Sequence, residues 1–135
     1  MKQLAIILML LFANSANADE MQHFNPEIIG KTVGECVLFL SPSTEDAIKP
    51  IQILADINER GIYYGAMITY PEALSFDVAK KSINKLYKKY EVPSFANDPD
   101  MGIWRNEDRR FSIQLSTKKE CNGKVLQVIY ISLDR

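Results

Sequence analysis

The chain has 135 residues, of which 47% are hydrophobic and 24% are charged, with 16 Lys and Arg against 17 Asp and Glu. These proportions are typical of one globular domain, and they exclude a disordered tail, a collagen-like repeat and a multi-pass membrane protein. The sequence pI of about 5.8 shows no excess of basic residues, so we expect no nucleic-acid partner.

The first 18 residues have the pattern of a secretory signal peptide. Lys2 precedes an apolar run from Leu4 to Ala13, and small residues follow as far as Ala18. The apolar run is far shorter than the roughly 20 residues that a membrane-spanning helix needs. We therefore expect cleavage after Ala18, which leaves residues 19–135 as a single domain without a membrane anchor. Its expected location is the bacterial periplasm, or the medium after secretion.

The two cysteines, Cys36 and Cys121, both belong to this mature part. Thiols usually pair in the oxidising compartments that exported proteins reach, so a structural disulfide between them is the favoured interpretation. Two buried free thiols are the main alternative. A redox pair is disfavoured because the usual Cys-x-x-Cys spacing is absent.

The first half of the mature chain is expected to form three strands. Residues 19–32 show no clear period and are expected to be irregular, whereas residues 33–40 form an apolar run typical of a buried strand. Apolar residues then alternate through 51–57 and 62–70, and the break at 58–61 ends in Gly61. This pattern predicts a β-hairpin. On its second strand, Tyr63 is expected to share a face with Met67 that the helix does not cover.

A helix and three further strands are expected to follow. Ser75 can cap an amphipathic helix whose apolar residues recur at spacings of three and four until Pro93 ends it. Its other face is rich in lysine, which is typical of a solvated surface. Residues 103–104 and 111–115 indicate a second hairpin, and Asn122 with Gly123 indicates a turn before a last strand, 125–133.

This order of elements, β-β-β-α-β-β-β, predicts an α+β fold. We expect one antiparallel sheet of five or six strands with the helix packed on one face. For the last hairpin, a three-residue loop would place Leu115 opposite Ile131, whereas a two-residue turn would place Leu115 opposite Tyr130. The first register is favoured because it keeps one apolar face.

Several catalytic chemistries are improbable for this sequence. His23 is the only histidine, which argues against a Ser-His-Asp or Cys-His site and excludes a multi-histidine zinc site. No catalytic residue, metal or cofactor is therefore assigned. Paired carboxylates remain as the alternative, a small envelope hydrolase that uses the acidic residues of one region, namely Asp98, Asp100, Glu107 and Asp108.

A non-catalytic protein-binding module, such as an inhibitor or immunity-type protein, is the favoured functional interpretation. Aromatic residues and arginine dominate the energetics of protein interfaces. They gather near the tip of the second hairpin, and the candidate contact residues are Trp104, Arg105, Arg109, Arg110 and, on the uncovered face, Tyr63. We expect a protein partner and a monomer or weak oligomer. A structural accessory of an envelope complex is a further alternative.

Overall fold

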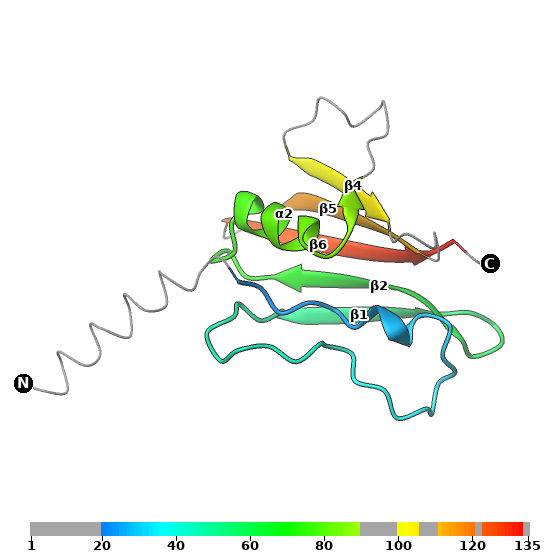
Figure 1. The fold of residues 1–135 in the computed structure, drawn as a ribbon. Coiled ribbons are helices and arrows are strands. Elements are labelled where there is room, and N and C mark those ends of the chain that lie inside the picture. Colours follow the sequence, from blue (N-terminus) through cyan, green and yellow to red (C-terminus); the bar gives the residue numbers. More distant parts are fainter. Residues whose placement is uncertain (1–19, 90–99, 106–110, 121–122, 134–135) are drawn as a thin grey trace, which may run out of the picture.

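The architecture is a single antiparallel sheet with one α-helix, seen in a computed structural model that describes residues 20–89, 100–105, 111–120 and 123–133. In the described residues the sheet has six strands in the order β1-β2-β6-β5-β4-β3 (Figure 1). The strands are β1 (Gln52–Ile57), β2 (Tyr63–Tyr70), β3 (Lys88–Lys89), β4 (Met101–Arg105), β5 (Phe111–Glu120) and β6 (Gly123–Ser132). The predicted α+β class, the antiparallel sheet and the hairpin formed by β1 and β2 are confirmed.

The helix α2 (Phe76–Asn84) begins as its sequence predicts. The Ser75 hydroxyl accepts a hydrogen bond of 3.2 Å from the amide of Val78, which satisfies one of the free N–H groups of the first turn. The helix ends several residues earlier than expected. The chain turns instead into β3, which pairs with β4.

The core lies on one face of the sheet, under α2 and the segment that follows residue 20. Both pass over the same side of the strands (Figure 1). This N-terminal segment includes a 3-10 helix, η1 (Pro26–Ile28), and supplies Met21, Phe24, Ile28 and Ile29 to the core. The ring centroid of Phe24 lies 4.8 Å from that of Tyr130 on β6. This segment, predicted to be irregular, is thus the second cover of the sheet.

Residues 33–40 do not form the predicted buried strand. The segment is irregular, Gly34 has a φ of 104°, and Val33, Leu38 and Phe39 are exposed. Among the described residues, its only β-pairing is an isolated bridge between Leu40 and Phe24. The prediction was wrong because the core positions expected for this run are filled by the N-terminal segment.

The predicted register of the last hairpin is also wrong. Leu115 lies opposite Val128, and Ile113 opposite Tyr130, because β5 and β6 are joined through residues 121–122. The buried face of β6 therefore carries Leu126, Val128 and Tyr130. The predicted register would instead have placed Gln127 and the other odd-numbered residues of β6 on the buried face.

Among the described residues the structure shows no disulfide, so the predicted Cys36–Cys121 bridge is not seen. Cys36 is exposed and not bonded to another cysteine, and Cys121 lies outside the described residues.

Among the described residues, no helix has the length and apolar character needed to cross a membrane. The predicted signal peptide, residues 1–18, lies outside the described part of the chain.

Candidate binding groove

Trp104, the central residue of the predicted contact patch, has no exposed surface. Its indole N–H donates a hydrogen bond to the side-chain oxygen of Asn84 at the end of α2. The six-membered ring of the indole lies against Gly102, whose missing side chain leaves the space that the ring occupies. Trp104 is therefore a core residue that joins α2 to β4, and it cannot contact a partner in the folded protein.

The other members of that patch are not brought together as expected. Arg105 is half-buried on β4, and Arg109 and Arg110 lie outside the described residues. Tyr63 packs against the core, with its ring edge-on to Phe39 at a centroid distance of 5.8 Å. An irregularity in the pairing places Tyr63 opposite Ile57 and skips Tyr64, so the expected alternation fails there.

The residues of the alternative carboxylate site are largely beyond the described chain. Of the four, the structure describes only Asp100, which is exposed, while Asp98, Glu107 and Asp108 lie outside the described ranges. In the parts of the chain that the structure describes, no group of three or more His, Cys, Asp or Glu side chains could hold a metal ion.

The contacts of His23 are those of a structural residue. Its Nε2 atom lies 2.8 Å from the hydroxyl of Ser82 on α2, and its Nδ1 atom is buried without a hydrogen-bond partner. Burial lowers the pKa of His23 below its ordinary value of 6.5. A proton on Nδ1 would be buried without an acceptor, so the neutral ring is the form that suits this position.

Exposed apolar side chains gather instead around β1 and the irregular segment before it. Two short stretches of sequence hold most of the large hydrophobic side chains that are exposed in the described residues, namely Val33, Leu38, Phe39, Ile51, Leu54 and Ile57. Leu38 is 72% exposed and Ile51 is 63% exposed. Single exposed apolar residues are common, but neighbouring ones such as Leu38 and Phe39 make a candidate interaction surface.

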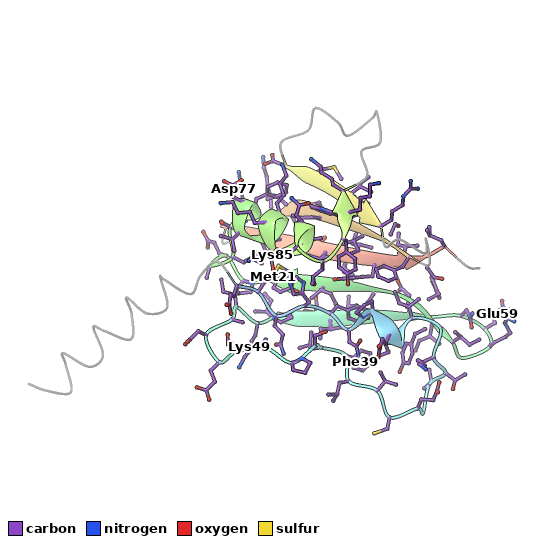
Figure 2. The ribbon with its side chains drawn as sticks, viewed as in Figure 1. Met21, Phe39, Lys49, Glu59, Asp77 and Lys85 are labelled. Carbon is purple, nitrogen blue, oxygen red and sulfur yellow. The ribbon has the colours of Figure 1, made fainter. Side chains whose placement is uncertain are left out.

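Part of this surface is hollowed into a groove of about 480 Å³. The groove lies between β1 and the segment that carries Phe39, which runs beside that strand (Figure 2). It has no charged side chain in its lining, which consists of Gln22, Leu38, Phe39, Leu40, Ser41, Pro42 and Ile53. We call this feature the β1 groove.

Hydrogen bonds hold the outer wall of the β1 groove in place. Asn25 uses both its backbone and its side chain: its amide donates to the carbonyl of Phe39 at 2.7 Å, and its Nδ2 donates to that of Leu38 at 3.0 Å. Gln22 Nε2 donates to the carbonyl of Ser41 at 3.1 Å. The carbonyl of Gln22 in turn accepts a 2.6 Å bond from the buried hydroxyl of Tyr70. The wall is thus connected to the core of the sheet, which limits the ordering cost of binding.

The β1 groove is not among the sites that the sequence predicts. The signal for it is weak: an apolar run without alternation, directly before the turn-forming residues Ser41 and Pro42. Such a run is equally typical of a buried strand. Only the position of the N-terminal segment decides that Leu38 and Phe39 stay at the surface.

Comparisons of the chain with protein-family models, with curated proteins and with solved structures found no match. The fold and the groove define a class only: a small α+β protein with one sheet and an apolar groove beside its edge strand.

Proposed function

We propose that this protein is an exported, non-catalytic binding module that captures an extended apolar segment of another protein in the β1 groove. The observation that carries the proposal is the uncharged groove beside β1, with the exposed side chains of Leu38 and Phe39 in its wall. The signal-peptide pattern of residues 1–18 supports an envelope or extracellular setting. An inhibitor or immunity-type role fits a rigid surface of this kind.

The position of β1 in the sheet favours an extended partner. β1 is an edge strand, with β2 as its one neighbour among the described strands. An extended chain can add to such an edge by main-chain hydrogen bonds, while every second side chain enters a pocket. If a partner strand pairs with β1, every second side chain of that partner points to the core side of the sheet. These side chains would contact Ile53 and the groove wall formed by Leu38 and Phe39.

The test uses purified protein of residues 19–135 and a phage-displayed library of heptapeptides. We expect enrichment of peptides with apolar residues at alternate positions. Leu38→Asp should weaken binding of the enriched peptides about tenfold or more, since losing one central apolar contact costs over 1 kcal/mol. N-methylation at alternate peptide nitrogens should weaken it as well.

Leu86→Asp is the matched control, because Leu86 is a leucine that is 55% exposed near the end of α2, away from the groove. Its peptide binding should equal that of the unchanged protein. A library that yields no enriched peptide, or equal losses for the two variants, would contradict the proposal.

A further inference from the structure

The sheet face opposite α2 is unusually poor in charge at its centre. The cross-strand pairings define a central row of outward-facing side chains, which consists of Leu54, Met67, Ile129, Gln114 and Ile103. The next row on one side is also uncharged, and one of its members, Thr69, is already buried among its neighbours. This row consists of Gln52, Thr69, Gln127, Ser116 and Met101. A solvated face of an antiparallel sheet is normally polar and rich in charge. Depletion of charge around apolar side chains is instead the pattern of an interface core.

The row on the other side of the central row carries charges of opposite sign at its two ends. The paired positions run from Asp56 on β1 through Ile131 on β6 to Arg105 on β4 and Lys88 on β3. The carboxylate of Asp56 lies on this face, because its Oδ2 is 3.5 Å from the position that a Cβ on Gly65 would take. Four strand spacings separate Asp56 from Arg105, a distance of about 19 Å.

This arrangement of charge is self-complementary about β6. β6 is the middle strand of the five that carry the face. A two-fold axis that runs parallel to β6, between the two sheets, stacks β6 of one copy on β6 of the other. It also places β1 of each copy opposite β4 of the other. Asp56 then faces Arg105 and Lys88 of the second copy, and the reverse pairing forms at the other end. A two-fold axis across the strands would stack β1 on β1 and bring no opposite charges together.

We propose that this uncharged sheet face binds the same face of a second copy of the chain, with the two-fold axis along β6. Two sheets packed in this way lie about 10 Å apart with their strands about 30° from alignment, within reach of long side chains. Ile129 of each copy lies next to the axis. The β1 groove opens on the other side of the sheet, beside the segment that covers the core, so dimer formation leaves it accessible.

The dimer is expected to be weak. Five strands about 4.8 Å apart, each contributing about five residues of about 3.3 Å, span only about 400 Å² in projection. A standard interface buries about 800 Å² on each partner. A dissociation constant in the micromolar range is therefore expected.

Sedimentation equilibrium over a micromolar concentration series tests the proposal. The unchanged protein should sediment as a concentration-dependent dimer. Ile129→Lys should sediment as a monomer, since it places two charges together at the axis. Lys81→Glu, a charge change on the exposed side of α2, is the control and should leave dimerisation unchanged.

A charge exchange separates the proposed axis from any other association. Asp56→Arg and Arg105→Asp should each be monomeric alone, because each places like charges opposite one another. An equimolar mixture should form a heterodimer, because both contacts are then between opposite charges. Arg105→Glu, which reverses the charge at the same position with a longer side chain, should replace Arg105→Asp in the mixture if the latter fails to fold by circular dichroism. Monomeric unchanged protein, a dimer insensitive to Ile129→Lys, or a mixture that stays monomeric would overturn the proposal.

Discussion

A methyl group at Gly102 would collide with the ring of Trp104. An ideal Cβ built on Gly102 lies 2.7 Å from Cζ3 of the indole, with other ring atoms also in contact. Carbon atoms are best separated by about 3.5–4.0 Å. Gly102→Ala therefore requires the ring or strand β4 to move by about 1 Å, although the ring is fully buried and is hydrogen-bonded to Asn84.

The expected cost of Gly102→Ala is about 3 kcal/mol, at the upper end of the range for overpacked cores. Trp104→Leu should also cost about 3 kcal/mol, because it leaves a cavity. In the Trp104→Leu background the clashing atoms are gone, so adding Gly102→Ala should cost nearly nothing. The two changes should thus be coupled by about 3 kcal/mol instead of being additive.

Urea unfolding followed by far-ultraviolet circular dichroism measures all four proteins on the same scale. Trp104 is the only tryptophan of the chain, so its fluorescence adds a check: Gly102→Ala should shift the emission towards that of a more solvated indole. Stability changes that add within about 0.5 kcal/mol would refute the inference that the ring occupies the space above Gly102.

Three further predictions concern the thiols and the buried titratable groups. Cys36 is exposed and not bonded to another cysteine, so both thiols of the chain should be alkylated in denaturant without prior reduction, as shown by the intact mass; an unmodified, oxidised pair would contradict this prediction. The pKa of His23 is lowered in the folded state, so below pH 6.5 the unfolded chain binds more protons than the folded one. The protein should therefore lose stability as the pH falls below 6.5. His23→Gln should flatten the curve of stability against pH between about pH 5 and 7. Burial raises the pKa of Tyr70 and of Tyr130, so stability should fall as the pH rises above about 10, where the unfolded chain loses protons first; absorbance titration should show these two phenols ionising only on unfolding.

The parts of the fold that the sequence predicts are those with local signals. The β1–β2 hairpin follows from alternation interrupted by a break that ends at Gly61, which has a φ of 74°. The start of α2 follows from Ser75, whose hydroxyl caps the first turn. Each signal depends on neighbouring residues and on nothing distant in the chain.

The wrong predictions concern segments that carry apolar residues on both of their faces. Strand β6 carries Val125, Ile129 and Ile131 on one face and Val128 and Tyr130 on the other, so alternation cannot decide which face is buried. The run at 33–40 likewise has apolar residues at every position from 36 to 40. In both cases the outcome depends on contacts with the segment near Phe24, and no periodicity reports such contacts.

The candidate contact residues failed for a related reason. Large aromatic residues serve both as interface anchors and as core residues, and the sequence does not separate the two uses. Trp104 lies across from Asn84 only because α2 packs on β4, and that contact decides its role.

The position of β6 in the sheet has a consequence for when the protein can fold. β6 pairs with β2 on one side and with β5 on the other, so it joins the two halves of the sheet. Phe24, near the start of the described chain, packs on Tyr130 of this strand. Neither the sheet nor its core can be completed until residue 132 has left the ribosome, so the domain reaches its folded state only after the last strand has been synthesised.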